Sequence, residues 1–344
     1  MNQMHAFAPF LDPEYILMMN RIFSLMTLGS IILLLFPVFV SIRADKIVDW
    51  SWLIVFTPLF ILDFVGLVYL TRSFGKNDQA DEEEREKDSA GSKIFILLYT
   101  VAHILFQVFL SLKIDSRIDW SWWIVFAPWF FVEFSHLILN TVEYFHTVSL
   151  VAHSDPENPE IAHAVPGLVK FNIFLSAFST WLFRLIQVIL IVIRLQSTTS
   201  WSWTVVFVPF YVYGCYNLLS IIFQYRIDKR LVESQPAGSE AKTAVRAQFI
   251  TKLFAFAVFA ILFYTLIGLF VTRLNSDLAG ETGPKASVIL IPVFLVLSIV
   301  ICCCGCCLPM LSSGLQKELE QEIMNQPGGS TNVVSPERRI ENAV

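Results

Sequence analysis

The strongest constraint on the fold is a succession of apolar blocks, each about twenty residues long. A helix that rises about 1.5 Å per residue needs this length to cross a hydrocarbon core of about 30 Å. Lipid offers no partner to an unpaired backbone polar group, so the blocks must be helices. The sequence predicts an all-α, polytopic membrane helix bundle with eight transmembrane helices, at residues 22–42, 52–71, 94–112, 122–142, 168–193, 203–224, 249–272 and 287–308.

Composition excludes an ordinary soluble domain. Hydrophobic residues make up 55% of the 344 positions, charged residues only 15%, and 31 residues are Phe. The chain carries no nucleophile motif, P-loop or dinucleotide fingerprint. We therefore predict a membrane protein that is not an enzyme and that needs no cofactor.

One phrase is written three times, as DWSWLIVFTPLF, DWSWWIVFAPWF and SWSWTVVFVPFY. Its first Trp always follows a basic residue by seven positions, and that residue (Arg43, Lys113 or Arg194) ends the preceding apolar block. The last two blocks keep a basic residue, Arg273, and a Pro but lack the two Trp residues. The pattern predicts four repeated helical hairpins with repeated packing.

Each position in the phrase has a physical interpretation. Trp rings suit the membrane boundary, so we expect an aromatic belt. The Ser between the two Trp residues is expected to cap the second helix of its hairpin. A Pro about two turns later should kink that helix, as a packing kink or as a hinge that lines a passage. The belt residues are Trp50, Trp52, Trp120, Trp122, Trp201 and Trp203, and the kink residues are Pro58, Pro128, Pro209 and Pro292.

The repeated W-S-W-x-x-V-F-x-P phrase resembles the eukaryotic transmembrane Fragile-X-F protein family. The likeness covers residues 20–225, which hold three of the four predicted hairpins. It implies a multi-pass membrane protein of internal membranes. It implies no catalytic residue and no substrate.

Polar segments separate the hairpins. The acidic run from Asp81 to Asp88 is expected to be a solvated loop rather than a metal or partner site. The predicted organisation is an N-terminal segment 1–21, a first hairpin 22–74, an acidic linker 75–92, a second hairpin 93–145, a linker 146–167, a third hairpin 168–226, a linker 227–246, a divergent fourth hairpin 247–308 and a tail 309–344.

Lys and Arg residues set the expected orientation. Seven lie at the hairpin tips, sixteen lie on the side with both termini and the linkers, and Arg184 lies within a helix, which accounts for all 24. The positive-inside rule places both termini in the cytosol. The expected location is an endomembrane of the endoplasmic reticulum or Golgi, with the plasma membrane as an alternative. The expected partners are the lipid bilayer and either another membrane protein or a second copy of the chain, with no nucleic acid.

Ionisable residues within the helices form the candidate site. Asp63 and Glu133 each follow a Pro by five residues, and His103 and Arg184 each precede a tip base by ten. At about 1.5 Å per residue, all four lie near the middle of the membrane, where an unpaired charge costs about 2.5–3.5 kcal/mol or more. His136 continues a polar stripe on the same helix as Glu133. The pattern predicts pairing, with Glu133 as a partner for His103, and Asp63 or Glu133 as a partner for Arg184.

Two functions fit this cluster. The side chains could carry an ion, proton or small solute, or they could join helices by polar contacts worth roughly 0.6–2 kcal/mol each. The second interpretation is favoured. No metal site is predicted, because Glu133-x-x-His136 is only half of a di-iron helix motif and the histidines of the 146–167 linker lack regular ligand spacing.

Five of the six cysteines lie together at the end of the last apolar block. Thiols at a membrane edge are typical sites of S-palmitoylation, although small apolar packing residues are the alternative. The lipidation candidates are Cys302, Cys303, Cys304, Cys306 and Cys307.

Overall fold

A computed structural model describes residues 13–76, 90–153, 164–234, 239–307 and 314. The chain forms one compact unit of residues 32–294 and another of residues 1–31 with 295–344. Much of the predicted N-terminal segment, of the linkers and of the tail lies outside the described residues, including the acidic run from Asp81 to Asp88.

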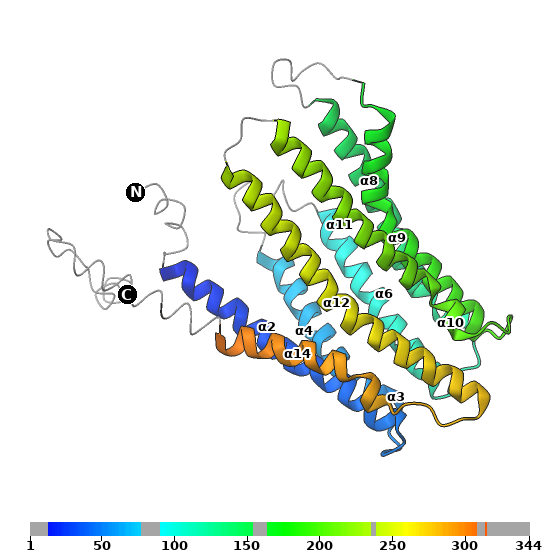
Figure 1. The fold of residues 1–344 in the computed structure, drawn as a ribbon. Coiled ribbons are helices and arrows are strands. Elements are labelled where there is room, and N and C mark those ends of the chain that lie inside the picture. Colours follow the sequence, from blue (N-terminus) through cyan, green and yellow to red (C-terminus); the bar gives the residue numbers. More distant parts are fainter. Residues whose placement is uncertain (1–12, 77–89, 154–163, 235–238, 308–313, 315–344) are drawn as a thin grey trace, which may run out of the picture. The chain divides into compact units, whose positions relative to one another are not determined.

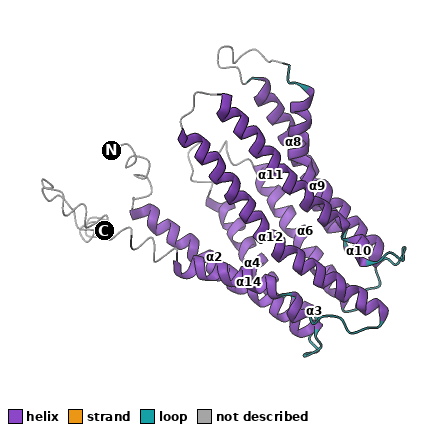
Figure 2. Ribbon diagram, in the orientation of Figure 1, coloured by secondary structure: helices purple, strands orange, loops and turns teal. Residues whose placement is uncertain are grey.

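The described residues contain helices and no strands, which confirms the predicted all-α class (Figure 2). Within the part of the chain that the structure describes, five helical spans are long and apolar enough to cross a membrane: Met18–Ala44, Ile94–Ile114, Gly167–Leu195, Trp203–Glu233 and Ala241–Ala279. The long helices are α2 (Pro13–Ala44), α4 (Thr57–Lys76), α6 (Ala90–Ile114), α8 (Ala127–Ala152), α9 (Gly167–Leu195), α11 (Val208–Ser234) and α12 (Ser239–Ala279). The shorter ones are α3 (Trp52–Val55), α7 (Trp122–Val125), α10 (Trp203–Val206), α13 (Ala286–Ile289), α14 (Ile291–Cys302) and the π-helical η3 (Cys303–Cys307).

Several helices run well past their apolar blocks. Helix α11 ends at Ser234 and α12 begins at Ser239, so most of the segment 227–246 is helical. Arg, Lys, Leu, Glu and Ala are all strong helix formers, which lets the helices continue beyond the apolar residues. Within residues 32–294, α4 packs on α6, α6 on α8, α8 on α9, α9 on α11 and α11 on α12 (Figure 1).

Four segments with the same contacts connect successive helices, and we call them tip segments: residues 43–58, 113–128, 194–209 and 273–292. Each begins at the basic residue that was recognised in the sequence. In the first, the Arg43 guanidinium donates to the Val48 carbonyl over 3.5 Å, and Lys46 has a positive φ of 57°. The amides of Lys46 and Ile47 bond the carbonyls of Arg43 and Ile42, as in a Schellman motif.

The same base-to-carbonyl contact recurs in the other three tip segments. The partners are Lys113 with Ile118, Arg194 with Thr199 and Arg273 with Pro284. Ser116 and Ser197 repeat the positive φ at the position of Lys46, and Gly280 adopts it in the longer fourth segment. The tip segments are therefore structural repeats, including the one that lacks the Trp-Ser-Trp phrase.

The prolines occupy a different position from the one expected. The helix that begins at Trp52 has only four residues, the chain turns at Phe56, and Pro58 is the second residue of α4. Pro128, Pro209 and Pro292 take the same place in α8, α11 and α14. The expected kink within one helix is thus a break between two helices. Proline suits the first turn, because the amide that it lacks has no helical partner there.

The Val-Phe pair of the phrase forms the core beside each break. Val55, Val125 and Val206 have no exposed surface, and Ile289 in the fourth segment is 4% exposed. Two residues before each tip base, Ser41, Ser111, Val192 and Val271 are also buried. Small and β-branched side chains at both positions let neighbouring helices approach closely.

Each short helix is capped by a side chain from a different tip segment. Ser51 occupies the N-cap position of α3, but its side chain makes no capping hydrogen bond. The Trp52 amide instead donates to both Asp115 carboxylate oxygens, over 3.1 and 3.0 Å. Gln196 likewise accepts from the Trp122 amide over 2.9 Å.

The remaining two caps close a cycle. Asn275 accepts from the Trp203 amide over 3.0 Å, and Asp45 accepts from the Ala286 amide over 2.7 Å. Every capping residue follows its tip base by two positions. The second tip segment therefore caps the first, the third caps the second, the fourth caps the third, and the first caps the fourth. We call this arrangement the capping cycle.

The capping cycle predicts unequal effects for two nearby residues. Asp115→Ala should lower the free energy of unfolding by about 1–2 kcal/mol, because the Trp52 amide loses the carboxylate that accepts from it. Ser51→Ala should change it by less than about 0.5 kcal/mol, because the hydroxyl makes no cap bond. Denaturant titration of the purified protein in detergent measures both. Equal losses for the two variants would contradict the cross-segment cap.

Candidate functional site

The candidate site consists of polar contacts that join successive helix pairs at similar depth. Helix α4 meets α6, α8 meets α9, and α11 meets α12. Each of these three junctions contains a side-chain hydrogen bond about 9–15 Å along the helix from a tip base. The centre of the site is the contact between α8 and α9.

Glu133 and Arg184 form that central contact. The guanidinium donates to both carboxylate oxygens, Nε to Oε1 over 2.6 Å and Nη2 to Oε2 over 2.9 Å. Glu133 is only 2% exposed, and the indole of Trp181 donates to its backbone carbonyl over 2.9 Å. The paired, planar geometry stabilises a carboxylate that would be costly to bury alone.

His136 extends the pair by one helical turn. Its Nδ1 lies 3.1 Å from Nη2 of Arg184, and its ring packs edge-on against Tyr99 of α6 at 5.6 Å between centroids. Because Nη2 can only donate, this geometry requires an unprotonated Nδ1. Three helices, α6, α8 and α9, thus meet at one polar cluster.

Asp63 and His103 lie apart from this cluster. Asp63 accepts from the Gln107 amide over 2.8 Å, which joins α4 to α6. His103 is half-buried on α6, and among the described residues it makes neither a hydrogen bond nor an ion pair. Of the two partners considered for Arg184, the structure selects Glu133, and it does not pair His103 with Glu133.

The third junction uses Tyr264, which the sequence pattern did not single out. The Tyr264 hydroxyl on α12 donates to the Phe210 carbonyl on α11 over 2.9 Å. Gly214, which occupies the place of Asp63 and Glu133 in its repeat, leaves the space for this ring. A Cβ there would lie 1.7 Å from the Tyr264 hydroxyl oxygen. The sequence signal for this contact was Gly214 itself, which has no side chain at the position that Asp63 and Glu133 occupy in their repeats.

This close approach predicts the effect of adding one methyl group. Gly214→Ala should cost about 1–3 kcal/mol, because the Tyr264 ring must move and lose its hydrogen bond. In a Tyr264→Ala background the same change should be nearly neutral. A double-mutant cycle on thermal unfolding in detergent measures the coupling. An equal cost in both backgrounds would contradict the steric explanation.

A cavity lies farther along the seam between α8 and α9. Its volume is about 280 Å³, and it is lined by Glu143, Thr147, Asn172, Ile173, Ser176 and Ala177. Glu143 continues the stripe that includes Glu133 and His136 on α8. Glu133 does not line the cavity, so the two polar features are distinct.

The cysteine cluster belongs to the unit of residues 1–31 and 295–344. Cys302 and Cys303 are exposed, whereas Cys304 is 8% exposed. Gly305 approaches Thr27, whose methyl carbon would lie 3.0 Å from an added Cβ. Cys306 and Cys307 continue the π-helical turn η3. In the described part of the chain, no group of three or more His, Cys, Asp or Glu residues is arranged to hold a metal ion.

The long apolar helices and the polar contacts between them define a helical membrane protein. Residues 3–117 and 112–325 match the family described as Transmembrane Fragile-X-F protein, and the chain belongs to that family. This match confirms the resemblance carried by the repeated phrase. No solved structure matches the chain.

Proposed function

We propose that the chain is a non-enzymatic structural or regulatory protein of an endomembrane, which crosses the bilayer eight times as four hairpins with both termini in the cytosol. The observation that supports this most is the use of the intramembrane polar groups. Asp63, Glu133 and Arg184 each bond a side chain of the neighbouring helix pair. Groups that hold helices together need no transported partner.

Glycosylation mapping tests the topology. An Asn-x-Ser/Thr acceptor inserted into any of the four tip segments should be glycosylated in cells, and one inserted into the C-terminal tail should not. Glycosylation of the tail would overturn the orientation. Modification at only some tip segments would overturn the eight-helix count.

A flux assay tests the functional class. Liposomes that contain the purified protein and a pH-sensitive dye should show the same proton flux as liposomes that contain the dye alone. Potassium and chloride gradients with a voltage-sensitive dye extend the test to other small ions. Flux above the empty liposomes would favour the second candidate, a transporter or channel.

The cavity between α8 and α9 is the observation that favours this second candidate. Glu143, Asn172 and Ser176 give it a polar lining that is separate from the contact between Glu133 and Arg184. A transporter that uses it would lose flux in Glu143→Gln without losing stability. Under the structural proposal, this variant folds normally and has no flux to lose.

Exposure of Cys302 and Cys303 supports S-palmitoylation of the chain. We expect acyl–biotin exchange to label the wild-type protein after hydroxylamine treatment. The label should fall strongly in Cys302→Ala/Cys303→Ala and persist in Cys215→Ala, in which the single distant thiol is removed. A hydroxylamine-independent signal, or the reverse pattern, would exclude these two sites.

A further inference from the structure

The ends of α11 and α12 opposite the tip segments carry a concentration of basic residues. Six Lys or Arg residues fall within 226–252, against the acids Asp228, Glu233 and Glu240. Helix α12 has 41 residues and is therefore about 61 Å long, roughly twice the thickness of a hydrocarbon core. Both helices continue past the apolar region as a packed pair, in which Tyr225 stacks on Phe249 at 4.2 Å between centroids.

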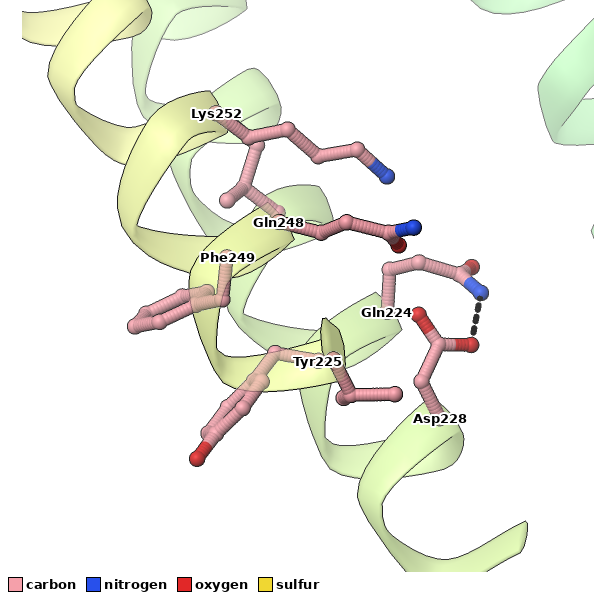
Figure 3. Close-up of a pocket in the computed structure, with 8 residues that line it drawn as sticks. Gln224, Tyr225, Asp228, Gln248, Phe249 and Lys252 are labelled. Atoms are coloured by element: carbon pink, nitrogen blue, oxygen red, sulfur yellow. Dashed lines mark hydrogen bonds between the residues drawn. The ribbon is translucent and has the colours of Figure 1, made fainter. Parts of the chain in front are cut away.

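The two sides of this helix pair differ. Figure 3 shows Gln224, Asp228, Gln248 and Lys252 pointing to one side, with the rings of Tyr225 and Phe249 directed to the other. On the polar side, the Gln224 amide donates to Asp228 over 2.8 Å. This pair leaves Asp228 already engaged within its own helix.

A second cavity, of about 180 Å³, lies beyond Tyr225 along the same pair. Its floor includes Tyr225, Val232 and Val245, and its cations are Lys229, Lys242 and Arg246. Glu233 also lines it and lies 3.9 Å from Lys229, in an exposed pair of little strength. The lining therefore retains a net positive charge beside an aromatic and aliphatic floor.

The depth of this cavity matches a lipid headgroup. Lys229 lies about 32 Å along α11 from Val208, and Arg246 lies about 40 Å along α12 from Arg273. A hydrocarbon core of about 30 Å is followed by a headgroup layer of roughly 5–8 Å. Lys229 thus lies at the level of lipid phosphates, and Arg246 and Lys242 lie at or beyond this level on the aqueous side. Tyr225, one helical turn nearer the core than Lys229, lies toward the acyl chains.

We propose that this cavity, which we call the α11–α12 headgroup site, binds the phosphorylated headgroup of an anionic phospholipid in the adjacent leaflet. Arg246 can donate in a planar fork to phosphate oxygens, while Lys229 and Lys242 supply point charges. Tyr225 lies below the phosphate, where its ring can contact the lipid, and Val245 lies beside Arg246. Placing the site in the anionic cytosolic leaflet depends on the orientation given under Proposed function.

Lipid titration of the full-length protein in detergent tests the site. The probes are dioctanoyl phosphatidylinositol 4,5-bisphosphate, dioctanoyl phosphatidylserine, dioctanoyl phosphatidylcholine and soluble inositol 1,4,5-trisphosphate. We expect the bisphosphate lipid to bind tightest and the soluble headgroup to bind more weakly, because it lacks the acyl contacts. Lys242→Gln/Arg246→Gln should weaken binding of the bisphosphate lipid about 30-fold. This factor corresponds to ~2 kcal/mol for the loss of two cations at a membrane surface.

A matched control variant distinguishes binding in the α11–α12 headgroup site from non-specific attraction by the positive charge of the two helices. Arg226→Gln/Arg230→Gln removes the same charge at similar depth from residues that do not line the cavity. It should weaken binding less than threefold. Equal losses in the two double variants, or equal binding of the serine and bisphosphate lipids, would overturn the site. Tighter binding of soluble trisphosphate than of the lipid would assign the cavity to a free phosphate ligand and overturn the lipid proposal. These measurements need no assumption about orientation, so failed binding leaves the proposed topology intact.

Discussion

Arg184→Leu is expected to abolish most of the assembled protein. The change leaves the carboxylate of Glu133, which is 2% exposed, without the guanidinium that bonds both of its oxygens. Removing one partner of a buried ion pair costs about 3–5 kcal/mol. We expect a small monodisperse peak in fluorescence-detected size-exclusion chromatography and a lower thermal midpoint for the residual protein.

A double variant tests whether Arg184 and Glu133 are needed only to pair with each other or are each needed for their charge. Glu133→Leu/Arg184→Leu should recover most of the yield, because apolar replacement of both partners removes the unpaired carboxylate. Arg72→Leu is the control, since this residue of α4 is exposed. A well-folded Arg184→Leu protein with altered flux would instead support transport. Failure of the double variant to recover would show that the charges act beyond their mutual contact.

Asp45→Ala is expected to produce the second large loss, of about 2–4 kcal/mol. Its carboxylate pairs with Arg273 over 3.0 Å and accepts from the Ala286 and Ser287 amides over 2.7 and 3.2 Å. The substitution removes one cap and leaves Arg273 with only its more distant acidic partner, the exposed Asp277 at 4.0 Å. Thermal unfolding in detergent measures the loss. Asp49→Ala should have no measurable effect, because that carboxylate is fully exposed, and similar losses at both positions would contradict the capping cycle.

Acid should weaken the same contact. Burial raises the pKa of Asp45, but the hydrogen bonds from Ala286, Arg273 and Ser287 together lower it by more than burial raises it. The pKa therefore lies below its ordinary value of 3.8. A carboxyl group whose pKa is lower in the folded than in the unfolded chain stabilises the fold at any pH above the unfolded pKa. This contribution is lost as pH falls through the folded pKa. Below about pH 4, the wild type should therefore lose stability more steeply than Asp45→Asn.

The sequence predicts the all-α class, because long apolar blocks require helices. Counting five residues from Pro128 and ten residues back from Arg194 placed Glu133 and Arg184 at one level, and the structure pairs them. The caps were missed for a physical reason. Ser51 satisfies the local rule for an N-cap, but Asp115 of another tip segment takes the Trp52 amide instead. A local rule does not reveal an acceptor 63 residues away.

The prolines and Gly214 show two further limits. A proline after an apolar helix start predicts a kink by the rule for helix interiors, yet the turn at Phe56 places Pro58 in a new first turn. Gly214 carries no side chain to attract notice, although Tyr264 depends on its absence. In both cases the result depends on how the chain and its neighbours are placed in three dimensions, and the periodicity of the sequence does not give that placement.

The capping cycle also imposes an order on biosynthesis. The Trp52, Trp122 and Trp203 amides each gain their acceptor within 63 to 74 residues, from the next tip segment to leave the ribosome. Asp45 must wait for Ala286, 241 residues later. At roughly 5–20 residues per second, that delay is roughly 10–50 s. A nascent or truncated chain that lacks Ala286 and Ser287 therefore leaves Asp45 without the two amides that it caps.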